Sequence, residues 1–343
     1  MKVCEQNRIN WEENLINFKH SIFLCPDWIE SMCDNQKKSF YINFVQNDVV
    51  QAKLSGLIIK GSKWKGNQLY AYAGPALSQP DERLNKECLQ ALFNYAKKKN
   101  IARIVLSSYD QPHNLSFSSP NFFNTSRYEY EIDINTHTPL SYSSRFKKNL
   151  RKAKKATTTL SIIDSSKGLK ALLKLVEETR SIRTQKKRKN YNPFFLPHMS
   201  KQSLEKMMPS SFARYTEISD NNKTLCVGLS LHAFPKTAIL MFGMNKMGYT
   251  LGISAQLFNN YINGNQQEMT EIINIGGIPS GQDGEHLSVF KESMGAKKRL
   301  VHGATTNFII YPYRLLNPLL NLGRNLPDNP LTKGLKWILN KSN

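Results

Sequence analysis

The sequence has 343 residues, a length that predicts two domains at roughly 100–200 residues per domain. No apolar run approaches the ~18–20 residues needed to cross a bilayer, and residues 1–10 lack the apolar core of a secretory signal, so a cytoplasmic protein is expected. The net charge of +21 indicates a partner that carries phosphate or another anion, unless the surface is simply basic throughout.

The cysteines favour reduced thiols in a cytosol. They are odd in number, widely spaced and without a Cys-x-x-Cys pair, which argues against a disulfide framework and against zinc. The histidines show no metal-ligand spacing either, so no metal is expected. The five cysteines are Cys4, Cys25, Cys33, Cys88 and Cys226.

The first half predicts one set of strands and helices, bounded by turn residues at Asn47-Asp48 and Gly74-Pro75. In order, these are a short helix at 26–32 with Asp27 as its cap, strands at 40–45, 49–59 and 69–73, an amphipathic helix at 81–99 and a strand at 101–106.

A similar order of elements returns in the second half. Strands are expected at 212–218, 225–232 and 238–244, followed by a helix at 254–262 and a strand that ends near 275. The repeat is one of element order rather than residue identity, and it favours two copies of one α/β fold.

The segment between the copies is strongly basic. Residues 142–156 predict a helix with a narrow apolar stripe, and no acid occurs between Asp133 and Asp164. A second basic run follows at 186–189. The cationic residues expected to hold phosphates, unless they only solvate a helix face, are Arg145, Lys148, Arg151 and Lys152.

The C-terminal residues differ from both copies. Residues 308–322 are apolar, and residues 331–339 mix Leu335, Trp337 and Ile338 with lysines. Such a segment could lie on an anionic membrane or dock on its own domain.

Residues 274–295 carry the most specific pattern. A strand ends in Gly276-Gly277, and a short helix with Phe290-Lys291 then stops at Gly295. Together with the basic helix and its Arg-Lys-Ala end at 151–153, this pattern resembles the FemAB-like branch of the GNAT acyltransferases. The resemblance covers about residues 28 to 303.

The resemblance implies a mixed α/β (α+β) fold, with two GNAT-like domains whose central mixed sheets are flanked by helices. The expected boundaries are 1–140 for the first domain, 141–200 for the helical segment, 201–305 for the second domain and 306–343 for the basic tail.

The resemblance also implies a function. We expect an N-acyltransferase that moves an aminoacyl or acetyl group to an amine of a peptidoglycan or polysaccharide precursor. The donor would be aminoacyl-tRNA or an acyl-CoA such as acetyl-CoA, with no tightly bound cofactor. Expected partners are tRNA, CoA or a nucleotide- or lipid-linked sugar precursor, and the inner face of an anionic membrane.

Two departures from the family pattern bear on this expectation. Asn274 stands where the family strand often carries an acid two residues before its glycine pair. Residues 248–252 do not match the pyrophosphate loop of ordinary GNAT enzymes, which leaves the donor open.

The predicted site centres on Lys291. We expect it to stabilise developing negative charge or a donor phosphate beside Gly276 and Gly277, with Phe290 at the same site; a surface lysine is the alternative. His286 in the neighbouring loop is a candidate base, as are Asp283 and Glu285. The competing function is a non-catalytic tRNA- or RNA-binding protein, which explains the charge but not the doubled fold.

Overall fold

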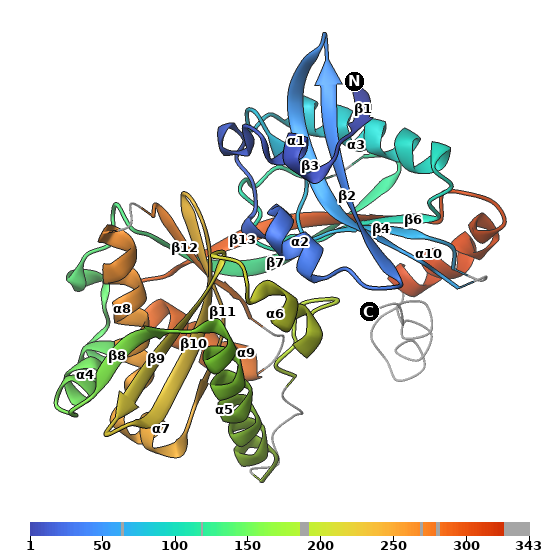
Figure 1. Ribbon diagram of the computed structural model, residues 1–343. Helices are drawn as coiled ribbons and strands as arrows, with labels where there is room; N and C mark the ends of the chain where they lie inside the picture. The colour runs from blue at the N-terminus through green and yellow to red at the C-terminus, as the bar shows by residue number, and fades with distance from the viewer. Residues whose placement is uncertain (63–64, 118, 186–191, 268–269, 279–281, 326–343) are drawn as a thin grey trace. The chain divides into compact units, whose positions relative to one another are not determined.

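The computed structural model describes residues 1–62, 65–117, 119–185, 192–267, 270–278 and 282–325 (Figure 1). The chain forms two compact units. The first comprises residues 1–126, 196–198 and the described residues from Val301 onward; the second comprises residues 127–195 and 199–300. The structure therefore places the described residues of the expected segment 141–200 in the second unit, apart from residues 196–198, and it places residues 301–325 in the first.

The first unit is built on a mixed sheet in the order β1-β2-β3-β4-β6, completed by the C-terminal part of β13. All neighbours are antiparallel except β4 and β6, which are parallel. The strands are β1 (Lys2–Glu5), β2 (Lys37–Gln46), β3 (Val49–Ile59), β4 (Gln68–Ala71), β5 (Ala76–Leu77, paired with β3), β6 (Arg103–Leu106) and β13 (Lys297–Thr306). The helices are α1 (Arg8–Glu12), η1 (Leu15–Asn17), η2 (Ile22–Leu24), α2 (Pro26–Ser31), α3 (Glu82–Lys98), η4 (Tyr313–Leu316) and α10 (Asn317–Asn325).

Local sequence signals explain these elements. Asn47 and Asp48 take the left-handed conformation, with φ of 50° and 58°, as a tight turn between two strands requires. The Asp81 carboxylate caps α3 by accepting the Leu84 N–H at 2.6 Å. Asp27 is not the cap of α2, because the helix begins at Pro26 and Cys25 holds the N-cap position.

The second unit has a mixed sheet in the order β7-β12-β11-β10-β9-β8, with β11 and β12 as its parallel pair. Its strands are β7 (Phe122–Asp133), β8 (Thr159–Ile163), β9 (Ala213–Asp220), β10 (Lys223–Ala233), β11 (Lys236–Met244) and β12 (Ile272–Gly277). Its helices are η3 (Pro139–Ser141), α4 (Ser144–Lys154), α5 (Ser165–Gln185), α6 (Lys201–Met207), α7 (Lys246–Leu251), α8 (Ile253–Gln267) and α9 (Gln282–Ser293).

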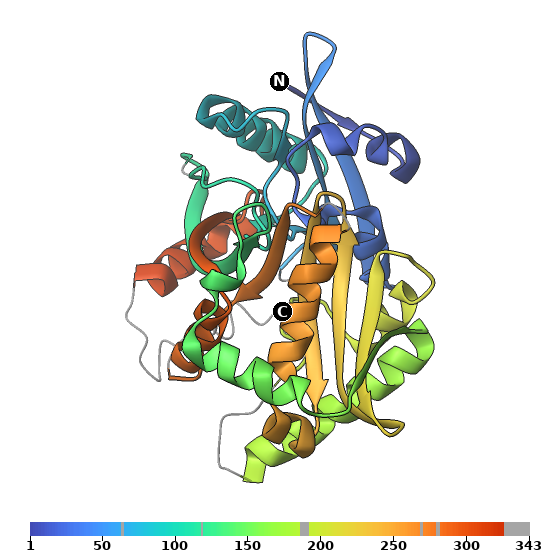
Figure 2. The ribbon, with the colours of Figure 1, turned by 90° about the vertical axis from the view of Figure 1, so that its left-hand side faces the viewer.

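Helices cover both faces of this second sheet. Gly228 of β10 lies against Tyr261 of α8, whereas Gly243 of β11 lies against Leu175 of α5. Because Gly243 pairs with Val227, the residue next to Gly228, the two glycines face opposite sides. Figure 2 shows α8 lying over the strands, and α4 packs on α8 from outside.

The order of elements predicted twice from the sequence is confirmed. In each unit three antiparallel strands are followed by a helix and a strand parallel to the third. Each sheet then gains an antiparallel strand from elsewhere in the chain: β13 pairs with β6, and β7 pairs with β12. Strands β1, β5, β7, β8 and β13 were not predicted. Among the described residues, no helix is both long and apolar enough to cross a membrane.

Candidate functional site

Strand β12 ends in an irregular turn that carries the predicted glycine pair. It pairs with β11 only from Ile272 to Asn274, while β11 continues to Met244. On its other edge its register against β7 shifts between Asn274 and Gly277, which is the signature of a bulge. Gly276 has a φ of +75°, a conformation that other residues rarely adopt.

Lys291 of α9 binds this turn through its backbone carbonyl groups. Its ammonium donates to the carbonyl oxygens of Ile275, Gly276 and Gly277 at 2.5, 2.8 and 2.8 Å. Its residue exposure is only 6%, and its Nζ lies 5.6 Å from the centre of the Tyr130 ring. A neutral amine has two N–H groups and could not satisfy three acceptors, so the turn is matched to the charged form.

The surroundings oppose that charge. Burial lowers the pKa of Lys291 to about 7, and the positive charge of Arg127 adds to the effect. The Lys291 ammonium points at backbone carbonyls, and the Gly276 N–H is bonded at 2.6 Å to Asn274 Oδ1. The structure thus brings Lys291, Gly276 and Gly277 together as predicted, with the lysine on the side of the turn where the carbonyl oxygens lie. Its action on a donor or an oxyanion stays a prediction.

A buried carboxylate of the neighbouring strand contacts Asn274. Asn274 is 2% exposed, and its side-chain amide donates to Glu129 Oε2 of β7 at 3.1 Å. Glu129 is itself 1% exposed and forms an ion pair with Arg127. One buried carboxylate therefore lies beside the turn, paired with a cation as burial requires.

A second carboxylate lies close by. Glu292 of α9 is exposed, and its Oε1 accepts hydrogen bonds from the Tyr130 hydroxyl at 2.9 Å and from Ser288 at 3.0 Å. Burial is the main cause that raises the pKa of Tyr130; the hydrogen bond to Ser288 opposes it and the bond to Glu292 adds to it, so the phenol stays protonated at neutral pH. Tyr130 thus connects Glu292 to Lys291. The sequence offered no signal for this cluster, because β7 was not predicted.

The other predicted residues of this region differ in burial. Phe290 is partly buried against the core and packs edge-on to Phe258 at 5.5 Å, an arrangement typical of packing. Glu285 and His286 are exposed on α9. The side chain of Asp283 lies outside the described residues.

The predicted basic helix is α4, which begins at Ser143 as N-cap. Phe146, Leu150 and Ala153 are buried, as the stripe predicted. Among the described residues, no ion pair involves the exposed cations Arg145, Lys148, Arg151 and Lys152. The second basic run, at 186–189, lies outside the described residues.

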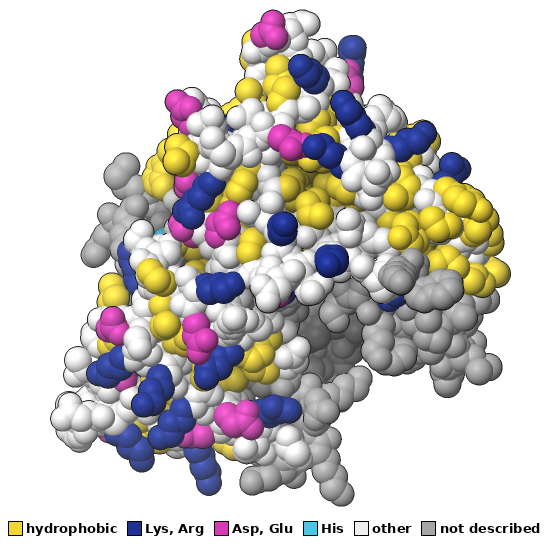
Figure 3. Space-filling model, turned by 45° about the vertical axis from the view of Figure 1, so that its right-hand side comes forward, with side chains coloured by type: hydrophobic (Ala, Val, Ile, Leu, Met, Phe, Trp, Pro, Cys, Tyr) yellow, Lys and Arg dark blue, Asp and Glu magenta, His cyan; other side chains and the backbone are white. Residues whose placement is uncertain are grey.

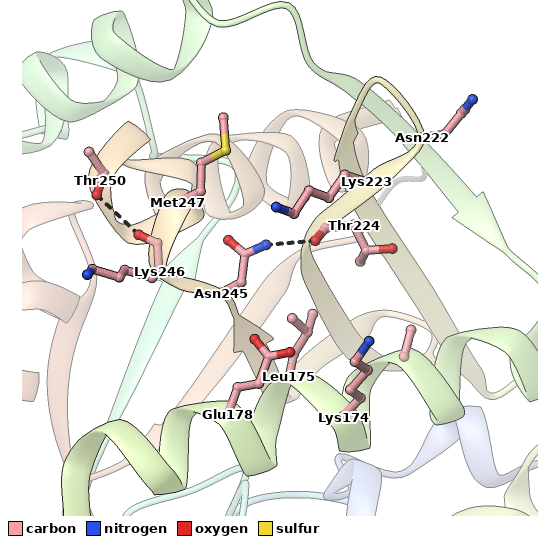
Figure 4. A pocket seen from close by; sticks show the side chains of 11 residues that line it. Lys174, Leu175, Glu178, Asn222, Lys223, Thr224, Asn245, Lys246, Met247 and Thr250 are labelled. Carbon is pink, nitrogen blue, oxygen red and sulfur yellow. Dashed lines mark hydrogen bonds between the residues drawn. The ribbon is translucent and has the colours of Figure 1, made fainter. Parts of the chain in front are cut away.

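A cleft of about 860 Å³ opens in the second unit (Figure 4). It lies between α5, the turn from β9 to β10 and the start of α7. Three of its lining side chains are lysines, Lys174, Lys223 and Lys246, against a single carboxylate, Glu178. The sequence did not single out these residues, because they come from three separate segments that only the fold brings together.

Residues 248–252, the nearest counterpart of a pyrophosphate loop in the sequence although they do not match it, form the second half and the end of the short helix α7. Asn245 caps it by accepting the Gly248 N–H at 2.8 Å, so this amide is already in use. Gly252 ends it with a φ of +75° and lies against the backbone of Asn149 in α4. The residues 248–252 thus join α4 to the cleft rather than form an open glycine-rich loop.

Two of the thiols are unsuited to act as nucleophiles. Burial raises the pKa of Cys88 and of Cys226, so both stay protonated at neutral pH. Within the described part of the chain, no group of three or more His, Cys, Asp or Glu side chains could hold a metal ion.

Comparison with solved structures shows what the fold is similar to. FemX superposes with a TM-score of 0.69 over 94% of this chain and 99% of its own, at 14% identity. The chain has the FemX fold. A protein of unknown function from Bacteroides thetaiotaomicron matches with a TM-score of 0.59 over 89% and 98%, at 10% identity. L-PGS from Bacillus licheniformis matches with a TM-score of 0.53 over 88% and 92%, at 13% identity.

The expected mixed α/β architecture is therefore confirmed, and it is a fold shared with FemX. No profile of a known protein family matches the chain, and no curated protein sequence does. At 14% identity, the likeness to FemX shows that the two proteins share a fold and shows nothing about their substrates.

Proposed function

We propose that the chain is an N-acyltransferase that moves an aminoacyl or acetyl group to an amine of a cell-envelope precursor, acting in the cytoplasm. The observation that carries the proposal is the turn at Gly276-Gly277, held by a buried lysine where β12 separates from β11, in a chain with the FemX fold.

The chemistry we propose uses the turn as an electrostatic frame. The acceptor amine attacks the acyl carbonyl and forms a C–N bond, and negative charge develops on the carbonyl oxygen. Each carbonyl bound to Lys291 belongs to a peptide unit whose N–H is polarised by that bond. The pairing of Gly277 with Glu129 of β7 uses the N–H of Gly277 or of Ile278, and the other of these two N–H groups is the donor we assign to the oxyanion. Lys291 then acts through the backbone.

We assign the proton of the attacking amine to Glu292. Its carboxylate is exposed, and Tyr130 and Ser288 orient it by hydrogen bonds. Collapse of the tetrahedral intermediate breaks the bond to the leaving oxygen or sulfur of the donor, and the proton passes to that atom.

We favour aminoacyl-tRNA over acyl-CoA as the donor. Residues 248–252 are folded as a capped helix, with the Gly248 amide in use. The exposed cations of α4 and the three lysines of the cleft instead supply several separate positive charges, which suit a polyanion. An acyl-CoA donor remains the second candidate, and binding of tRNA without transfer is the competing function.

The test is to incubate the protein with charged tRNA or with acetyl-CoA, each in the presence of amine-bearing peptidoglycan precursors, and to measure product mass. We expect a product from charged tRNA whose mass rises by one aminoacyl residue. A product from acetyl-CoA alone would transfer the assignment to the second donor. Tight tRNA binding without any product would support the RNA-binding alternative and overturn the enzyme proposal.

A further inference from the structure

The helical stretch formed by η4 and α10 is apolar on two sides. Its inner side packs on the first unit, where Leu320 is 5% exposed and forms a small core with Ala102 and Phe308. Leu316 is partly buried against the same core. This inner side explains why the stretch docks, and it leaves the outer side to be explained.

The outer side carries a ridge of large apolar side chains. We call it the outer ridge: Tyr311, Leu315, Leu319 and Leu322, which are 75%, 65%, 44% and 53% exposed. The three leucines recur at helical spacing and so share one face. Figure 3 shows a patch of hydrophobic side chains where η4 and α10 lie. A contiguous apolar patch of this kind marks an interaction site more often than scattered exposed leucines do.

The charge around the ridge narrows the choice of partner. The sequence has no Asp or Glu from Ser293 to Pro327, whereas Arg314 is exposed between two ridge residues. Lys97 and Lys98 are exposed at the end of α3, which leads directly to Ala102 beneath the helix. A segment that carries an apolar ridge and cations but no carboxylates suits the surface of an anionic bilayer, where negative headgroups cover an apolar interior.

We propose that the outer ridge docks this protein on an anionic lipid bilayer. The stretch from Tyr313 to Asn325 is too short to span a membrane, so it lies in the interface with Leu315, Leu319 and Leu322 turned into the acyl boundary. Arg314 then meets lipid phosphates. The proposal stands independently of acyl transfer, because no ridge residue belongs to the catalytic or donor-binding groups assigned above.

The experiment is sedimentation of the full chain with vesicles of phosphatidylglycerol and, separately, of phosphatidylcholine. The test variant combines Leu315→Glu with Leu319→Glu, both at exposed positions. The matched control combines Ile9→Glu with Leu140→Glu, which are 79% and 87% exposed and lie outside the ridge. Thermal unfolding and light scattering establish that each variant is folded and report its oligomeric state.

We expect the wild-type chain and the control to bind phosphatidylglycerol vesicles and to bind phosphatidylcholine much less. The ridge variant should lose about tenfold or more of this partitioning. Vesicle binding retained by the ridge variant would overturn the proposal. If removal of residues 326–343 then abolishes vesicle binding, the binding belongs to that segment. A wild-type dimer that the ridge variant converts to a monomer, with no vesicle binding by either, would overturn it too and assign the ridge to a second copy of the chain.

Discussion

The side-chain amide of Asn274 in β12 donates a hydrogen bond of 3.1 Å to the buried carboxylate of Glu129 in the neighbouring strand β7. Asn274 also accepts from Gly276 N–H at 2.6 Å and thereby fixes the turn. An amide serves both roles, because it carries a donor and an acceptor.

Asn274→Asp should therefore destabilise the fold. It would set a second buried carboxyl against Glu129 and raise the pKa of the pair, at a cost of about 2–4 kcal/mol at neutral pH. Because the folded pair would hold a proton that the unfolded chain releases above pH ~4, the loss should grow as pH rises from there. Combining it with Glu129→Gln restores one carboxylate and should recover part of the stability. Equal unfolding temperatures for wild type and Asn274→Asp would contradict this account.

Lys291→Met should lower both stability and transfer. Three carbonyls would lose their donor, which costs about 3 kcal/mol. Acyl transfer should fall because the glycine turn loses its frame. The matched control is Lys297→Met, an exposed lysine on β13. Transfer at the wild-type rate by the Lys291 variant would end the role proposed for this lysine.

The stability of the protein should depend on pH through Lys291. Burial lowers its pKa from 10.5 to about 7, so between these values the unfolded chain binds the extra proton. The free energy of unfolding should consequently rise as pH increases from about 7 toward 10. Lys291→Met should lack this part of the slope in denaturant titrations at several pH values, and parallel curves for the two proteins would refute the prediction.

Glu292→Gln should lower kcat by about 100-fold, with a small effect on stability, since the side chain is exposed and glutamine retains an acceptor oxygen. Tyr130→Phe removes one orienting bond and should have a smaller effect. Glu285→Gln, an exposed residue of the same helix, is the control. Rates equal to wild type in all three variants would exclude Glu292 as the base.

Replacing Arg151 and Lys152 by glutamine should weaken tRNA binding and make it less dependent on salt. For each phosphate that the variant no longer neutralises, the slope of log affinity against log salt should become shallower by about 0.9. The control replaces Lys97 and Lys98 on α3, which carry the same charge but lie outside α4 and the cleft. If both double variants lower affinity equally, general basicity rather than α4 binds the nucleic acid.

Sequence patterns reached the repeated strands because hairpins and capped helices are local. The Asn47-Asp48 turn and the Asp81 cap depend on their own neighbours alone. Strand β7 escaped notice because residues 124–127 are Asn, Thr, Ser and Arg, a polar run typical of a loop. That omission hid Glu129 and Tyr130, and with them half of the candidate site.

The sequence predicted that Lys291 lies beside Gly276 and Gly277, but it did not predict that the lysine is buried and bonded to three backbone carbonyls. A lysine on a short helix next to a glycine pair usually faces water, and only the bulge in β12 turns three carbonyls toward it. The cleft was equally inaccessible, since its lysines come from α5, the turn before β10 and α7.

The pairing of β13 with β6 has a consequence for how the protein is made. The first unit receives its last strand from residues 304–305, so its sheet is incomplete until these residues have left the ribosome. The second unit, whose residues end at Leu300, is translated in full before that strand arrives. Although its sequence comes first, the N-terminal unit therefore completes its fold last during synthesis, and its open edge at β6 is where a nascent chain is most exposed to mispairing.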